Sequence, residues 1–447
     1  MNDPSPPDLT AASEALAQRR VSAVELLAGC LEQIDRGNAA IRALTHVARD
    51  GAQADAEAAD RRRVRGAPLG PLDGIPLVIK ANIPVRGWPL TAGLRFRAQT
   101  LAESDAFVVS RLRAAGAVIV GLSNMDEGAL GAEGNNPWFG AIQNPHRPGY
   151  SAGGSSGGSA AALAAGMCHG ALGTDTIGSV RIPASFCGVA ALKPSFGLVS
   201  VAEVVAVHLR FDHVGPMARS VRDLLPLLQA TAAYDPYCRV SAPLSLTPPR
   251  GLDATRRIAF LSGLEQFQVA DEVLAGYNDS IARIRATGVS LVHIDANQWD
   301  IGRLRRAILA LCEREMWRVH RERISQQPEQ YSDGLRAFIR YGGKLGEEEL
   351  AAAETRIARF YAQWSAAMAA FDAVILPTTA CTAFAHGERP PHNTADLTTL
   401  ASATGLPALS LPVRVPEGAL PVGLQIIGRV AGDLDLIQIG AELEAAK

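Results

Sequence analysis

The chain has 447 residues, 48% of them hydrophobic and 20% charged, which allows a large buried core and excludes a globally disordered protein. Its formal net charge of -2 gives no support to a nucleic-acid or anionic-membrane partner. The N-terminus lacks the pattern of a signal peptide, and no apolar run approaches the roughly 20 residues that span a bilayer. The 6 cysteines are scattered without a C-x-x-C pair, as in reduced thiols, so we expect a cytoplasmic protein with no membrane partner.

The chain begins with helical patterns over residues 8–63. A Pro/Gly-rich break at 68–74 follows, and the apolar run Ile75–Ile79 predicts a buried strand that ends at Lys80. Burial would disfavour the charged ammonium of Lys80, and a neutral lysine can act as a general base. An ordinary strand-end lysine that reaches solvent is the commoner case, so Lys80 alone does not decide between the two.

A helix at Ala106–Ala115 and a strand at Ala117–Gly121 continue the rhythm of a parallel α/β sheet. The polar segment Ser123–Glu127 then follows the strand, at the end where open α/β sheets place their sites. Met125 and Glu127 either line a pocket there or cap the next helix, and the sequence does not choose.

Residues 149–200 hold the strongest signal for chemistry. A glycine-rich loop at 153–158 leads into a predicted Ala/Leu helix at 160–165, and a second tight polar turn covers Thr174–Ser179. Linkers rarely lie between two long apolar segments, and the G-K-[ST] of a phosphate-binding loop does not follow the glycines. The nucleophile elbow G-x-S-x-G is absent at Ser179. Two serines on separate tight loops therefore indicate a serine nucleophile supported by backbone N–H donors.

The second half of the chain is less specific. His213 invites a role as a base, but a structural, hydrogen-bonded histidine is the more frequent case. Residues 270–370 read as mainly helical with one strand, and we expect this region to carry specificity, with its charge run at 302–324 on solvated helix faces. The other predicted elements are helices at 220–230 and 434–444 and strands at 257–261, 289–294, 373–377, 408–413 and 422–428.

Several motifs together resemble the amidase signature family over nearly the whole chain. They are G-P-L-D-G-I-P-L-V-I-K at 70–80, G-G-S-S-G-G-S at 153–159, G-T-D-T-I-G-S-V-R-I-P-A-S-F-C-G at 173–188, L-K-P-S at 192–195, G-L-P-A-L-S-L-P-V at 405–413 and P-V-G-L-Q-I-I-G at 421–428. The resemblance implies one α/β domain over 1–447 with a large mixed sheet covered by helices on both faces. Its parts would be N-terminal helices at 8–63, a catalytic core at 64–230, the helical specificity region at 250–370 and C-terminal strands and a helix at 371–447.

The resemblance also implies a Ser-cisSer-Lys catalytic set with Ser179 as nucleophile, Ser155 as the bridging serine after a cis peptide, and Lys80 as base. Backbone N–H groups of Thr176, Ile177, Gly178 and Ser179 would form the oxyanion hole, and no metal or cofactor would be needed. Met125, Glu127, Asp175 and Arg181 are the candidates for the substrate pocket.

Two positions depart from the family pattern. Lys80-Ala81-Asn82 stands in place of Lys-Asp-Asn, and Ile177 introduces a β-branched residue into the oxyanion turn. Isoleucine cannot easily adopt a positive φ, so the turn must use a conformation open to ordinary residues. Neither change removes a catalytic group.

The expected activity is serine-dependent hydrolysis of a small amide or urea-like substrate with release of ammonia or an amine. The motifs look most like carboxybiuret hydrolases, and K-A-N-I also looks like indoleacetamide hydrolases. The alternative is an amidotransferase-type or partner-dependent subunit with little hydrolysis of its own. We expect that role less because the amidotransferase chains of this family normally carry a C-terminal extension. A homodimer or a small accessory subunit is left open.

Overall fold

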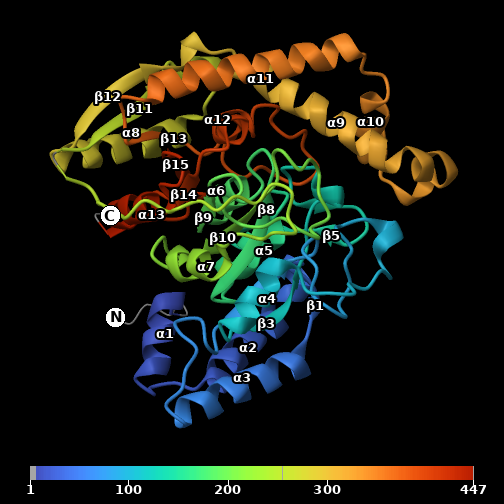
Figure 1. The fold of residues 1–447 in the computed structure, drawn as a ribbon, viewed down its shortest axis with the longest axis vertical. Coiled ribbons are helices and arrows are strands. Elements are labelled where there is room, and N and C mark those ends of the chain that lie inside the picture. The colour runs from blue at the N-terminus through green and yellow to red at the C-terminus, as the bar shows by residue number, and fades with distance from the viewer. Residues whose placement is uncertain (1–6, 254, 446–447) are drawn as a thin grey trace.

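The computed structural model describes residues 7–253 and 255–445 and is built on one 11-stranded mixed sheet (Figure 1). Its strands are β1 (Leu44–Val47), β2 (Pro76–Lys80), β3 (Val118–Ser123), β8 (Gly170–Asp175), β9 (Ala190–Lys193), β10 (His213–Ala218), β11 (Arg257–Ser262), β12 (Ser290–Asp295), β13 (Ala373–Pro377), β14 (Ala408–Pro412) and β15 (Gly423–Ile427). Their order across the sheet is β1-β3-β2-β8-β10-β9-β14-β15-β13-β11-β12. Two small ribbons pair β4 (Asn135–Asn136) with β5 (Gly140–Ala141) and β6 (Gln143–Asn144) with β7 (Arg147–Ser151).

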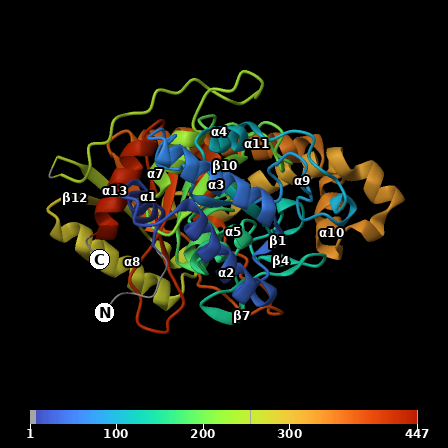
Figure 2. The ribbon, with the colours of Figure 1, turned by 90° about the horizontal axis from the view of Figure 1, so that it is seen from below.

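Thirteen α-helices pack around this sheet in the described part of the chain. They are α1 (Leu9–Ala17), α2 (Ala23–Ile41), α3 (Arg49–Val64), α4 (Phe107–Ala114), α5 (Gly157–Ala164), α6 (Arg181–Cys187), α7 (Leu224–Thr231), α8 (Asp271–Ala286), α9 (Ile301–Gln326), α10 (Asp333–Gly342), α11 (Glu347–Met368), α12 (Asp396–Thr404) and α13 (Asp433–Ala445). Seen from below, α9 and α10 lie at the opposite end of the molecule from β12 and α13 (Figure 2). None of the helices in the described ranges is long and apolar enough to cross a membrane.

Helices cover both faces of the sheet. Two glycines of β8 illustrate this, because they point to opposite faces and each lies close to residues of a covering layer. A methyl group at Gly170 would come within 2.8 Å of Leu77 on β2 and 3.0 Å of Leu227 on α7. Gly173 is three residues further along the strand and therefore points to the other face, where a methyl group would come within 2.7 Å of the Ser156 hydroxyl. The observed architecture is thus the single α/β domain with a large mixed sheet that the sequence predicts.

Because three neighbouring strands run in the same direction, the polar residues at their carboxyl ends lie at the same edge of the sheet. β2 runs parallel to both β3 and β8, so the carboxyl ends of these three strands meet at the same edge. Lys80, Ser123 and Asp175 end the three strands there. β10 runs antiparallel to β8 and places His213 opposite Asp175.

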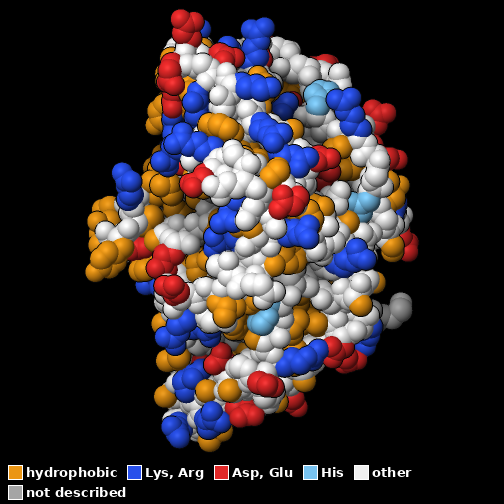
Figure 3. Space-filling view, turned by 90° about the vertical axis from the view of Figure 1, so that its right-hand side faces the viewer, with side chains coloured by type: hydrophobic (Ala, Val, Ile, Leu, Met, Phe, Trp, Pro, Cys, Tyr) orange, Lys and Arg blue, Asp and Glu red, His pale blue; other side chains and the backbone are white. Residues whose placement is uncertain are grey.

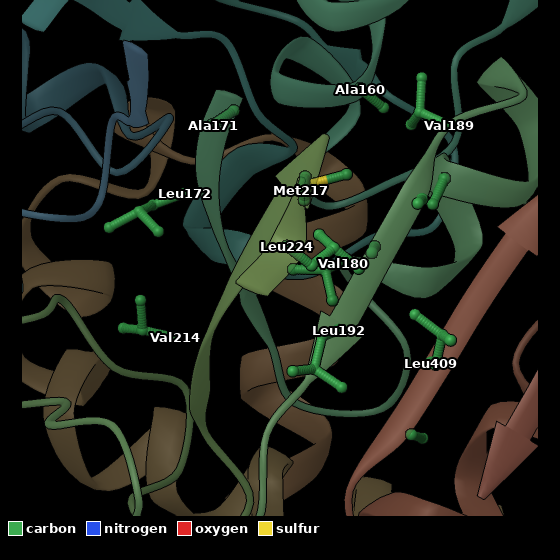
Figure 4. Close-up of a cluster of buried hydrophobic side chains, with 14 of the residues drawn as sticks. Ala160, Ala171, Leu172, Val180, Val189, Leu192, Val214, Met217, Leu224 and Leu409 are labelled. Carbon is green, nitrogen blue, oxygen red and sulfur yellow. The ribbon is translucent and has the colours of Figure 1, made fainter. Parts of the chain in front are cut away.

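Val180 anchors this edge to the buried core. A methyl group at Gly173 would lie 2.8 Å from Val180 Cγ1, and one at Gly215, on the neighbouring β10, would lie 3.2 Å from Val180 Cγ2. The two glycines leave the space that Val180 occupies, within the apolar cluster that also includes Met217 and Leu192 (Figure 4). The residue after Ser179 is therefore fully buried.

Most predicted elements are confirmed, including the strand that ends at Lys80 and the helix before the second serine loop. Several strands and helices were not predicted: β1, which interrupts the helical pattern of residues 8–63, the ribbon strands β4–β7, and β8, α6, β9, β10 and α12. The face drawn in Figure 3 carries acidic and basic side chains side by side, which agrees with a net charge close to zero.

Candidate active site

Lys80 and the two serines come from three elements that meet at the edge described above. Lys80 ends β2, Ser155 lies in the loop before α5, and Ser179 lies just before α6. The Lys80 Nζ atom donates hydrogen bonds to Ser155 Oγ at 2.8 Å and to Thr174 Oγ1 at 2.8 Å. The Ser156 N–H donates to the Ser179 carbonyl at 3.0 Å, which joins the two serine loops, and the Gly154–Ser155 peptide is cis.

The surroundings of Lys80 favour its neutral form. The side chain is fully buried, and this burial lowers its pKa to about 7, although the carboxyl groups of Asp126, Asp175 and Asp212 act in the opposite direction. Thr174 and Ser155 supply oxygen partners without adding a charge next to the amine. A neutral amine that touches Ser155 Oγ can accept a proton from it.

A buried ion pair holds the backbone around Ser179. Arg181 donates to Asp175 through Nε and Nη2, both at 2.9 Å, and neither side chain is exposed. Burial alone would raise the pKa of Asp175, but the charge and hydrogen bonds of Arg181 outweigh it and hold that pKa well below its usual range. The same carboxylate accepts the Gly178 N–H at 2.7 Å and the Val180 N–H at 3.3 Å, so it fixes the residues on both sides of Ser179.

The turn from Thr176 to Ser179 lies against a cavity, but its four N–H groups are not equivalent. The Gly178 N–H already donates to Asp175, which removes it from the expected set of oxyanion donors. Thr176, Ile177 and Ser179 line the cavity. The positive φ of the turn, 130°, falls on Gly178 and not on Ile177, so the isoleucine keeps an ordinary backbone conformation as expected.

The cavity next to Ser179 has a volume of about 180 Å³ and is mostly apolar. Its walls come from several separate parts of the chain. The lining residues are Ala129, Leu130, Gly131, Ala132, Thr176, Ile177, Ser179, Ile182, Val207, Arg305, Leu309, Cys312 and Ala395. A cavity of this size beside a buried lysine and two serines can hold a small substrate with its reacting carbonyl at Ser179.

The four pocket candidates lie elsewhere. Met125 is fully buried in the main core, and Asp175 and Arg181 are bound to each other beneath the Ser179 turn. Glu127 accepts the indole N–H of Trp138 at 2.8 Å and the backbone N–H of Ser332, the residue before α10, at 3.1 Å. The structure thus gives these side chains packing and hydrogen-bonding partners instead of a place on the cavity wall.

The wall formed by α9 was not predicted from the sequence. Arg305, Leu309 and Cys312 follow the i, i+4, i+7 spacing of one helix face and line the cavity together. The charged run that contains Arg305 was interpreted as a solvated face, which is wrong for this residue. Helical spacing alone could have grouped the three positions, but the packing of α9 decides which face meets the cavity.

His213 has partners on both ring nitrogens. Nδ1 donates to the Phe211 carbonyl at 2.7 Å, which leaves Nε2 to accept from the buried Lys193 Nζ at 3.1 Å. Burial and the neighbouring Lys193 lower the pKa of His213 to about 3. These contacts agree with the structural role that the sequence favoured. Within the described ranges, no group of His, Cys, Asp or Glu side chains is arranged to hold a metal ion.

The chain is similar to known proteins over nearly its whole length. The family model described as Amidase matches residues 25–437. The chain is 37% identical to the A chain of the glutamyl-tRNA(Gln) amidotransferase of Chloroflexus aurantiacus, over 97% of this chain and 95% of the relative. A crystal structure of an amidase matches with a TM-score of 0.89 and 32% identity, over 98% of this chain and 99% of the other. A structure reported with a vestigial protein complex and the origins of an s-triazine catabolic enzyme matches with a TM-score of 0.92 and 30% identity, over 98% of both chains. The chain belongs to the Amidase family of amidase signature proteins and is an enzyme that acts on C–N amide bonds.

Proposed function

We propose that the chain cleaves the C–N bond of a small amide or urea-like substrate through an acyl-enzyme on Ser179. The observation that carries this proposal is the 2.8 Å hydrogen bond between the buried Lys80 Nζ and Ser155 Oγ, next to a cavity that Ser179 lines. Lys80 and Ser155 would have no need of this arrangement in a purely structural loop.

The proposed proton path is short. Neutral Lys80 accepts a proton from Ser155, which accepts one from Ser179 while Ser179 Oγ attacks the amide carbon. Backbone N–H groups of the Thr176–Ser179 turn, other than that of Gly178, hold the oxyanion, and each such donor is typically worth about 3–4 kcal/mol. The proton then passes to the leaving nitrogen, and water releases the acyl group from Ser179.

The relatives support a second candidate, an amidotransferase-type subunit that releases little ammonia without a partner. The relative from Chloroflexus aurantiacus is named as one subunit of an amidotransferase, and the alignment covers 95% of its length. This coverage contradicts the expectation that a C-terminal extension sets such subunits apart. The comparisons favour this candidate over hydrolysis by the chain alone, and both use the same acyl-enzyme step.

An assay of ammonia release by the full chain alone distinguishes the two candidate functions. The panel contains a biuret-type ureide, indole-3-acetamide, an aryl amide, a short aliphatic amide and glutamine. We expect Ser179→Ala to abolish any turnover, and Ser325→Ala, which removes an exposed hydroxyl of α9, to leave it unchanged. Labelling of Ser179 by a fluorophosphonate without turnover of any amide supports the partner-dependent role. Turnover that survives in Ser179→Ala contradicts the assigned nucleophile.

A further inference from the structure

The cavity beside Ser179 has one charged group. Among the described residues that line it, Arg305 alone carries a charge, and apolar side chains such as Ile177, Ile182 and Leu309 make up most of the remaining surface. Arg305 lies in the first turns of α9, far in sequence from the residues that we assign to the acyl-enzyme step. A charge in such a place needs either a protein partner that satisfies it or a ligand that does.

The protein partner covers only part of the guanidinium. Arg305 Nε donates to Asp396 Oδ1 at 2.5 Å, at the start of α12. Among the described residues, Asp396 is the one hydrogen-bond partner of the Arg305 side chain. The Nη1 and Nη2 groups are therefore left for another acceptor. The Arg305 side chain is 23% exposed and that of Asp396 is 9% exposed, which places the carboxylate deeper and the guanidinium at the open cavity.

This geometry suits an anion better than a neutral group. A guanidinium presents parallel N–H donors that match the two oxygens of a carboxylate, and such a pair is strong where apolar walls exclude water. Asp396 holds the Nε edge and thereby orients the plane of the fork. A neutral, apolar substrate would instead bury the remaining N–H groups of Arg305 without accepting hydrogen bonds from them, which would cost binding free energy.

We propose that Arg305 is a specificity determinant that binds a carboxylate of the substrate, so that this enzyme acts on short amides that carry an anionic group away from the scissile C–N bond. The inference rests on the proposed function of Ser179. Because Arg305 and Ser179 line one cavity of about 180 Å³, the carboxylate and the amide must be separated by only a short spacer.

The test compares succinamate with succinamide, which have nearly the same shape and differ in one carboxylate. Ammonia release by the full chain gives kcat and KM for both compounds, in the wild type, Arg305→Gln and Arg305→Lys. Arg303→Gln is the matched control, because Arg303 lies on the same helix, is 73% exposed and pairs with Asp300. Calorimetric titration of both compounds into Ser179→Ala measures binding without turnover.

We expect wild type to prefer succinamate in kcat/KM. Arg305→Gln should lower kcat/KM for succinamate by roughly 10- to 100-fold, mainly through KM, and should change the value for succinamide little. Arg305→Lys, which keeps the charge but loses the fork, should lie between them, and Arg303→Gln should match wild type. Ser179→Ala should bind succinamate more tightly than succinamide.

Two results overturn the inference alone: Ser179-dependent turnover without preference for the anion, or equal losses on both compounds in Arg305→Gln. Equal binding of both compounds to Ser179→Ala overturns it as well, even where the chain needs a partner for turnover. Turnover that persists in Ser179→Ala contradicts the proposed function instead, and is thereby distinguished from a failure of the Arg305 assignment.

Discussion

Replacement of Gly178 by alanine should displace Ser179 more than it disturbs the rest of the fold. Gly178 has a φ of 130°, and a methyl group there would lie 2.4 Å from Thr398 Oγ1. Thr398 cannot withdraw freely, because its hydroxyl donates to the Ile177 carbonyl at 2.6 Å. The unfavourable φ costs about 1–3 kcal/mol and the overpacking a further 1–3 kcal/mol or so.

The control is Gly149→Ala. Gly149 also has a positive φ, 86°, but no atom lies within 4 Å of a methyl group built on it. It should therefore incur only the backbone cost of about 1–3 kcal/mol.

The assay is the rate at which a fluorophosphonate labels Ser179, with the urea midpoint of each variant measured in parallel. Gly178→Ala should label roughly 100-fold more slowly than wild type, because a shift of about 1 Å at a reacting group has that effect. Gly149→Ala should label at the wild-type rate. Wild-type labelling by Gly178→Ala, with a urea midpoint equal to that of Gly149→Ala, would refute the claim that this glycine sets the position of the nucleophile.

Two further predictions concern the groups around Ser179. The labelling rate should rise as the pH increases through about 7, because below that pH the buried Lys80 is protonated and cannot accept a proton, and Lys80→Met should remove this rise in a pH series. Arg181→Met leaves the buried Asp175 without its charged partner and should destabilise the protein by about 3–5 kcal/mol in urea unfolding. Glu32→Ala, which breaks an exposed ion pair with Arg36, should cost no more than about 1 kcal/mol, and equal losses in the two variants would contradict the buried-pair argument.

Sequence patterns predicted those helices and strands whose hydrophobic residues follow a clear pattern. The apolar run before Lys80 became β2, because a strand buried on both faces reads as continuous hydrophobic sequence. The strand β10 escaped prediction because its sequence, H-V-G-P-M-A, puts glycine and proline inside a central strand. The glycine is explained by packing, since a methyl group at Gly215 would lie 2.4 Å from the Leu192 carbonyl oxygen and 3.2 Å from Val180, and such a reason becomes visible only in three dimensions.

The candidate site also has a part that could be predicted from the sequence and a part that could not. The resemblance to the amidase signature family selected Lys80, Ser155 and Ser179, and the structure brings Lys80 and Ser155 into contact and joins the two serine loops. The cavity wall was not predictable, because Arg305 belongs to a charged helix with no local sign of which face is buried. Two of the pocket candidates, Asp175 and Arg181, flank Ser179 in sequence, yet in the structure they pair with each other inside the protein.

The seating of Val180 against Gly173 and Gly215 has a consequence for how the enzyme fails. Ser179 is followed directly by Val180, whose side chain packs over two paired central strands where they carry glycine, so Ser179 is held in place while those strands stay paired. Heat should therefore act on catalysis as a switch and not as a gradual loosening: activity persists until the middle of the sheet opens, and both are then lost together.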